Sequence, residues 1–128
     1  MLLQRDTAKL LGSIAFLAMW EGRFAESEAI FHALREDAPD RVGPPMGLAL
    51  SLMHQGRFGA AVTRLEADVL PLSPQDPHAR CWYGLALYMD KQYTRSRDVL
   101  KQVADEKTVP DAADLARSLL LEMDEKGV

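Results

Sequence analysis

Three histidines and one cysteine are the side chains of this sequence that most readily do chemistry. His32, His54 and His78 are candidate metal ligands or proton carriers, and Cys81 is a candidate nucleophile. No histidine has a second histidine four residues away, the spacing that puts two ligands on one face of a helix. We therefore expect solvent-facing or capping histidines. We interpret Cys81 as a small residue of a binding groove or of the core. The sequence predicts no catalytic residue, no metal ion and no cofactor.

Composition also limits the partners of this chain. The net charge is −4, from 19 acidic and 15 basic residues mixed along the sequence, which does not indicate nucleic-acid binding. The longest apolar run, residues 14–20, is far shorter than the roughly 20 residues of a membrane span, and no secretory signal opens the chain. A single cysteine allows no intrachain disulfide, so the expected location is a reducing compartment, the cytoplasm.

The elements that position side chains are predicted to be helices, because no segment alternates apolar and polar residues with strand periodicity. Short turns recur before Phe24, Phe58 and Tyr93, which are 34 and 35 residues apart. Such a period predicts stacked helical hairpins. The expected single domain, 1–128, has about seven helices: hairpins over 2–38, 44–70 and 77–105, and a capping helix over 110–126 that starts with a cap at Thr108 and an early Pro110.

Small and aromatic residues repeat in register when Ala8, Val42 and Pro77 are each set as the first position of a repeat. The small residues that would let paired helices cross closely are Ala15 with Ser27, Ala49 with Ala61, and Gly84 with Ser96. Apolar residues of the second helices, Phe31, Leu65 and Leu100, complete each hairpin core. The pattern resembles the tetratricopeptide repeat, although Lys91 replaces the usual turn glycine and Asp68 stands where alanine is usual.

This resemblance implies an all-α, right-handed superhelix whose first helices line a concave groove. The side chains at the groove-lining positions that we expect to bind a partner are Phe16, Met19, Trp20, Met46, Leu50, Met53, Cys81, Leu85, Tyr88 and Met89. Methionine suits an adaptable binding surface. The alternative is that these residues are core, or that the terminal helix folds into the groove.

A second resemblance concerns residues 11–35 and 76–86, which are similar to segments of the cytosolic chaperones of bacterial type III secretion systems. It implies a non-catalytic protein that holds an apolar helix or extended segment of a needle, translocator or export subunit in the bacterial cytoplasm. The alternative is a scaffold that self-associates as a homodimer through the same apolar surface. A basic group that includes Arg57 and Arg64 is interpreted as a solvated convex face, with binding of an acidic partner as the alternative.

Overall fold

The computed structural model describes residues 3–128, and every regular element in this part of the chain is a helix. The predicted all-α class and the seven predicted helices are confirmed for these residues. The helices are α1 (Arg5–Trp20), α2 (Phe24–Asp37), α3 (Gly43–His54), α4 (Phe58–Arg64, continued by a π-helical turn, Leu65–Val69), α5 (Pro77–Met89), α6 (Tyr93–Ala104) and α7 (Pro110–Lys126). The first helix was expected to start at Leu2, which lies outside the described residues.

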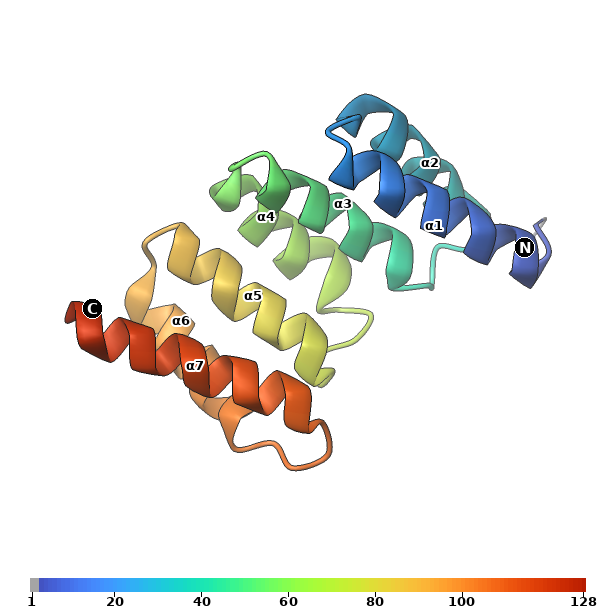
Figure 1. Cartoon of the computed structure of the whole chain (residues 1–128). Coiled ribbons are helices and arrows are strands. Elements are labelled where there is room, and N and C mark those ends of the chain that lie inside the picture. Colours follow the sequence, from blue (N-terminus) through green and yellow to red (C-terminus); the bar gives the residue numbers. More distant parts are fainter. Residues whose placement is uncertain (1–2) are drawn as a thin grey trace. The chain divides into compact units, whose positions relative to one another are not determined.

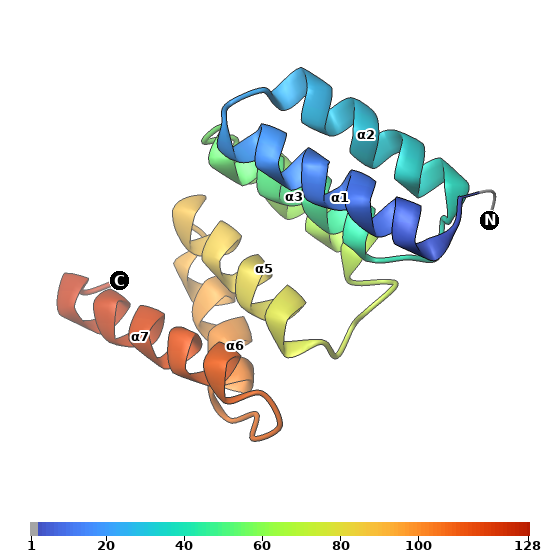
Figure 2. The ribbon, with the colours of Figure 1, turned by 45° about the vertical axis from the view of Figure 1, so that its right-hand side comes forward.

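The helices fall into two compact units, one extending to Leu72 and the other beginning at Ser73. In the first unit α1 packs on α2 and on α3, α2 packs on α3, and α3 packs on α4 and its π-helical turn. In the second unit α5 pairs with α6, and α7 packs on both of them. Figures 1 and 2 show these packed neighbours within each unit. The first unit therefore contains two helical hairpins, and the second contains one hairpin with its closing helix.

The turn within each hairpin has the same backbone hydrogen bonds. Gly22, Gly56 and Lys91 all have positive φ, at 80°, 76° and 63°. The next amide in each turn donates to the carbonyl oxygen five residues earlier, as in Arg23 to Ala18 at 2.8 Å. This is the Schellman pattern of a helix C-terminus, which favours glycine at the left-handed residue. Lys91 adopts the turn despite its side chain, so the third hairpin has the predicted shape at a conformational cost.

Small residues let the two helices of each hairpin approach closely. Ala15, Ala49 and Ala61 are fully buried, as are Ser27 and Ser96. The Ser27 hydroxyl donates to the Ala15 carbonyl oxygen at 2.7 Å, and Ser96 donates to Gly84 in the same way at 2.7 Å. Each hydroxyl thus replaces the water it loses on burial with a bond to the partner helix. These bonds confirm the predicted crossing points of the first and third hairpins, and Ala49 and Ala61 of the second are buried as predicted.

The two hairpins of the first unit pack through Phe31. Its ring lies beside Ala15 and Leu48 in one buried cluster, and a Cβ atom added to Gly47 would lie 2.4 Å from it. That distance is far inside van der Waals contact, so only glycine lets α3 approach α2 at this depth. Phe16 packs edge to face on the same ring, with centroids 4.9 Å apart.

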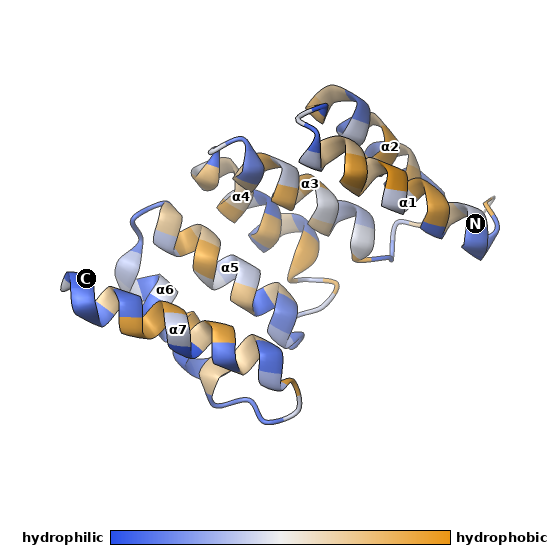
Figure 3. Ribbon diagram, in the orientation of Figure 1, coloured by the Kyte–Doolittle hydropathy of each residue, from blue (hydrophilic) through white to orange (hydrophobic). Residues whose placement is uncertain are grey.

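The apolar residues that recur at helical spacing along α1 are only partly buried. Leu10, Ile14 and Leu17 are 62%, 44% and 60% exposed, whereas the buried side of the helix consists of Ala8, Ala15, Ala18 and Met19. The side of α1 that carries alanines packs against α2 and α3. The side that carries Leu10, Ile14 and Leu17 is left exposed by the described helices. Figure 3 shows the apolar colouring along α1.

The end of the second hairpin was predicted to be an ordinary α-helix, but its last turn is π-helical, with Leu70 N–H donating to Leu65 O at 2.9 Å. Asp68 lies in this turn. Its carboxylate accepts from Arg64 at 2.8 Å and pairs with Arg35 of α2 at 3.0 Å. The aspartate that departs from the repeat pattern therefore ties α2 to the end of α4.

The start of α7 also differs from the expectation in one detail. Pro110 is the first helical residue, as predicted, but the cap residue is Val109 and no side chain caps the helix. The Thr108 hydroxyl donates instead to the Glu106 carboxylate at 2.9 Å. Thr108 therefore stabilises the loop before α7 and is not a helix cap.

We predict that Lys91→Gly raises the free energy of unfolding by about 1 kcal/mol, because glycine accepts the left-handed backbone without a Cβ clash. Urea denaturation followed by circular dichroism measures this change. Lys91→Ala is the matched control, since alanine removes the long side chain and keeps the Cβ. An equal gain in both variants would show that the dihedral angle is not the cause.

We predict that Asp68→Asn lowers stability by about 1 kcal/mol near neutral pH. Burial opposes ionisation of Asp68, but the Arg64 hydrogen bond and the Arg35 and Arg64 charges outweigh it and lower the pKa of the carboxyl from its ordinary 3.8. A lowered folded-state pKa gives stabilisation that is present above the unfolded-state pKa and lost as pH falls through the folded-state pKa. Melting temperatures of the two proteins should therefore converge in acid; a constant difference down to pH values below both pKa values would contradict this account.

Candidate functional site

In the first unit, α1 and α3 carry six of the predicted groove residues. Phe16 on α1 and Met46, Leu50 and Met53 on α3 are half-buried, so each presents part of its apolar surface to solvent. Met19 is only 2% exposed and belongs to the packing of α1. Four of these five side chains are thus accessible to a partner, whereas Met19 is buried.

Trp20, the sixth of these residues, forms an exposed aromatic cluster. Its ring is 67% exposed and meets the His54 ring edge to face, with centroids 5.2 Å apart. His54 also contacts the Phe24 ring, at 5.6 Å. His54 was expected to face solvent or to cap a helix. It is exposed, as His32 and His78 are, and it also joins α1 to α3 through its contact with Trp20.

An apolar pocket of about 170 Å³ opens between α1, α2 and the start of α3. Its wall includes Phe16, Phe31 and Leu34, and its rim carries Lys9, Asp37 and Arg41. Two of the lining residues are glycines, and both leave open space. A Cβ added to Gly12 would lie 4.0 Å from its nearest neighbour, Leu34, and one added to Gly43 would have nothing within 4 Å. The pocket can therefore accept an apolar side chain from outside.

In the second unit, α7 covers part of the predicted surface. Cys81 is 4% exposed, and its thiol lies 3.9 Å from the Ala112 carbonyl oxygen on α7. Burial raises the pKa of this thiol, so the reactive thiolate is disfavoured, although His78 lies one helical turn before it. These contacts fit the interpretation of Cys81 as a small packed residue. They also fit the alternative in which the terminal helix covers part of the groove, because α7 lies against Cys81.

The other predicted residues of α5 remain accessible. Leu85 and Tyr88 are half-buried and Met89 is exposed. The Tyr88 hydroxyl accepts a hydrogen bond from Lys126 at 3.1 Å, and its ring packs on Tyr93 with centroids 5.8 Å apart. A second apolar pocket, of about 160 Å³, is lined by His78, Cys81, Trp82, Leu85, Asp111, Ala112 and Leu115. The sequence did not identify Trp82 and Leu115 as pocket-lining residues, because that depends on where α7 packs.

The repeat pattern is confirmed by comparison with known protein families. The tetratricopeptide repeat matches residues 14–77 and, in a second overlapping match, residues 46–113. These matches cover more than half of the sequence. The chain belongs to the tetratricopeptide repeat family. A comparison with curated protein sequences finds no match. No helix among residues 3–128 has both the length and the apolar character to span a bilayer.

Solved structures with the same fold include translocator chaperones. The chain is similar to the Yersinia enterocolitica type III secretion translocator chaperone SycD in an alternative dimer, with a TM-score of 0.83 and 16% identity over 99% of this chain and 98% of that chain. It is also similar to SycD in complex with a peptide of the translocator YopD, with a TM-score of 0.79 and 16% identity over 100% of each chain. PcrH in complex with the chaperone-binding region of PopD gives a TM-score of 0.79 and 15% identity over 100% of each chain. Because the sequence identities are only 15% and 16%, this similarity shows that the proteins share a fold.

Proposed function

We propose that this tetratricopeptide repeat protein is a non-catalytic chaperone that holds an apolar segment of a partner protein on the exposed faces of its first helices. The observation that carries the proposal is the apolar pocket that Gly12 and Gly43 line beside Phe16. An apolar side chain that enters it leaves water and gains about 1.5 to 3 kcal/mol before ordering costs are subtracted. Several such anchors give useful affinity.

The partner class that we propose is a subunit of a type III secretion system, either a needle, a translocator or an export subunit. Support comes from the similarity to SycD and PcrH, which were solved with segments of the translocators YopD and PopD. A subunit that assembles through apolar helices needs its apolar segment covered before assembly. The proposed location is the bacterial cytoplasm, in line with a single cysteine that the chain keeps as a buried thiol.

A binding role also fits the chemistry of the described side chains better than catalysis does. His32, His54 and His78 are exposed and lie on three different helices, and the Cys81 thiol has a raised pKa. The polar groups at the rim of the α1 pocket surround an apolar interior. That arrangement binds and orients a segment, and it offers no activated nucleophile.

We predict that Gly12→Leu and Leu50→Glu each abolish stable partner binding while the helical content and melting temperature stay nearly unchanged. The leucine fills the pocket from within, and the glutamate places a charge on the surface where an apolar side chain would be buried. The measurement is quantitative mass spectrometry of proteins that copurify with each variant from the native host. A small protein with an apolar helix, stoichiometric with the wild-type chain and lost in both variants, is the expected result.

Thr7→Leu is the matched control for this experiment, because it adds the same side chain to an exposed position of α1 that does not line the pocket. It should retain the partner. Retention of the partner by Gly12→Leu and Leu50→Glu as well would rule out the proposed surface.

Self-association is the second candidate function, and the exposed stripe of Leu10, Ile14 and Leu17 on α1 favours it. These side chains are four and three residues apart and share one face of the helix. If this face pairs with a second copy, Leu17→Glu converts a dimer to a monomer in light scattering at micromolar concentration, and Thr7→Leu does not. A wild-type chain that is monomeric under these conditions would exclude this function.

A further inference from the structure

Two apolar pockets, one in each unit, are built from the same positions of the repeat. The α1 pocket has a volume of about 170 Å³, and the pocket between α5 and α7, here called the α5 pocket, has about 160 Å³. Three residues of α1 have counterparts on α5 that lie 69 residues later, which is two repeat lengths: Lys9 with His78, Gly12 with Cys81, and Phe16 with Leu85. In each unit the next helix that packs on the first completes the pocket, with Gly43 and Pro44 of α3 or Asp111 and Ala112 of α7.

The size of both pockets suits a single side chain. Each is well below the roughly 300 to 1,000 Å³ of a small-molecule site. Gly12 and Cys81 are small residues at the same repeat position, and Phe16 and Leu85 beside them are half-buried apolar walls. The repeat therefore provides the same kind of apolar site twice.

The rim of the α1 pocket is positive. Lys9 and Arg41 both line it, and neither side chain forms an ion pair within residues 3–128. Its one carboxylate, Asp37, already accepts a hydrogen bond from the Leu3 amide at 3.1 Å. The two cations come from α1 and from the loop before α3, so they can meet acidic groups on both sides of a bound apolar side chain. Complementary charge favours an acidic neighbour for the anchor in this pocket.

The rim of the α5 pocket is negative. Asp111 lines it and forms no ion pair within the described part of the chain. His78, its other polar lining residue, has Nδ1 3.9 Å from a carboxylate oxygen of Asp76. Among the described residues that line this pocket there is no lysine or arginine. Complementary charge here favours a basic neighbour for the anchor.

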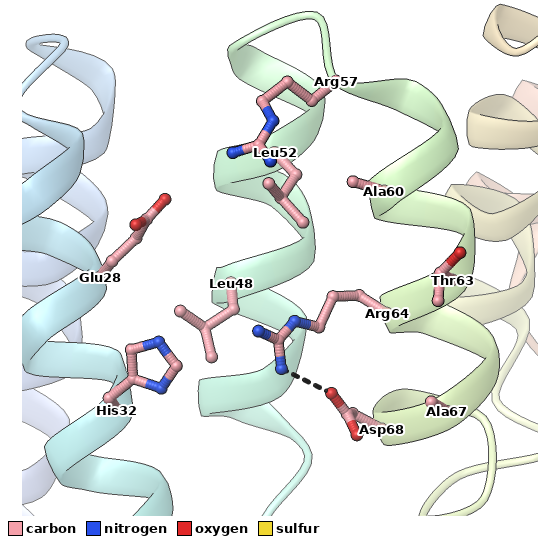
Figure 4. Close-up of a pocket in the computed structure, with 10 residues that line it drawn as sticks. All are labelled: Glu28, His32, Leu48, Leu52, Arg57, Ala60, Thr63, Arg64, Ala67 and Asp68. Atoms are coloured by element: carbon pink, nitrogen blue, oxygen red, sulfur yellow. Dashed lines mark hydrogen bonds and ion pairs between the residues drawn. The ribbon is translucent and has the colours of Figure 1, made fainter.

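A third pocket of the first unit lacks such a bias. It lies between α2, α3 and α4, has a volume of about 500 Å³, and is shown in Figure 4. Arg57 and Arg64 among its lining residues are balanced by Glu28 and Asp68, and Arg64 is already paired with Asp68 at 2.8 Å. The unbalanced rims are thus a property of the two small apolar pockets.

We propose that the α1 and α5 pockets are equivalent anchor sites, and that the held segment carries two apolar anchors with different neighbours. The anchor for the α1 pocket has an acidic residue beside it, and the anchor for the α5 pocket has a basic one. This inference rests on the proposed holding function and adds the chemistry of the anchors. Exchanging the two anchors would place like charges at both rims, so the segment binds in one direction.

The test uses two short peptides, each with one leucine as the anchor and with both ends chemically blocked. The leucine is flanked by glutamates in the acidic probe and by lysines in the basic probe. Each is titrated into the full-length, isotope-labelled protein at pH 8, where histidines in general are mostly neutral, and amide shifts are followed by NMR. The amides of Gly12 and Gly43 report on the α1 pocket, and those of Cys81 and Ala112 report on the α5 pocket.

We expect the acidic probe to bind the α1 pocket about fivefold tighter than the basic probe, because two exposed cations face its glutamates. The basic probe should bind the α5 pocket about threefold tighter than the acidic probe, because one carboxylate faces its lysines. Both preferences should shrink at about 1 M salt. A third probe, with alanine in place of leucine, should bind both pockets about tenfold more weakly, since less apolar surface leaves water.

Variants separate the rims from the pockets. Lys9→Glu together with Arg41→Glu should reverse the preference at the α1 pocket, and Asp111→Asn should remove the preference at the α5 pocket. Lys101→Glu is the matched control, because it makes the same charge change at an exposed position of α6 that lines neither pocket. Gly12→Leu should abolish binding of both probes at the α1 pocket and leave binding at the α5 pocket unchanged.

Four results would overturn the inference. Both probes bind both pockets with equal affinity, which would leave the holding function standing without the assigned anchors. Neither probe shifts a pocket amide at about 20 mM, an affinity too weak for an anchor. The preferences persist unchanged in the Lys9→Glu, Arg41→Glu protein and in Asp111→Asn. A peptide that ends in leucine with a free carboxylate and neutral neighbours binds the α1 pocket more tightly than the acidic probe, which would assign this rim to a chain terminus.

Discussion

Close crossing of paired helices at small residues is the constraint on which the rest of this structure depends. Ser27 bonds to Ala15 and Ser96 bonds to Gly84, and Ala49 and Ala61 are buried at the corresponding positions of the second hairpin. A larger side chain at any of these points would separate the two helices and expose Phe31, Leu65 or Leu100. The surface proposed to bind a partner rests on helices held in this way.

The first unit presents a small apolar pocket that is lined by glycines of α1 and of the start of α3, where a partner side chain can be buried. A pocket of this kind contributes to binding mainly through the apolar area that leaves water.

The sequence predicted the features that depend on local spacing. The period, the turns, the starts of α2, α3, α4, α5 and α7 to within one residue, and burial of Phe31, Leu65 and Leu100 were all accessible from the repeat pattern. Features that depend on packing between distant residues were not. A periodic stripe does not say which side of α1 is covered, and Leu10 and Leu17 lie on the exposed side. Burial of Met19 and Cys81 depends on neighbouring helices, and the pairing of Asp68 with Arg35 requires the contact of α2 with the end of α4.

The position of Cys81 beneath α7 has a practical consequence for studies of motion in this protein. Separation of α7 from α5 increases the access of a thiol-specific reagent to its sulfur, because the residue is only 4% exposed while Ala112 of α7 lies against it. Since it is the single cysteine of the chain, every modification event reports on this one position. A change in its labelling rate when a partner binds therefore measures how the partner alters the exposure of this part of α5.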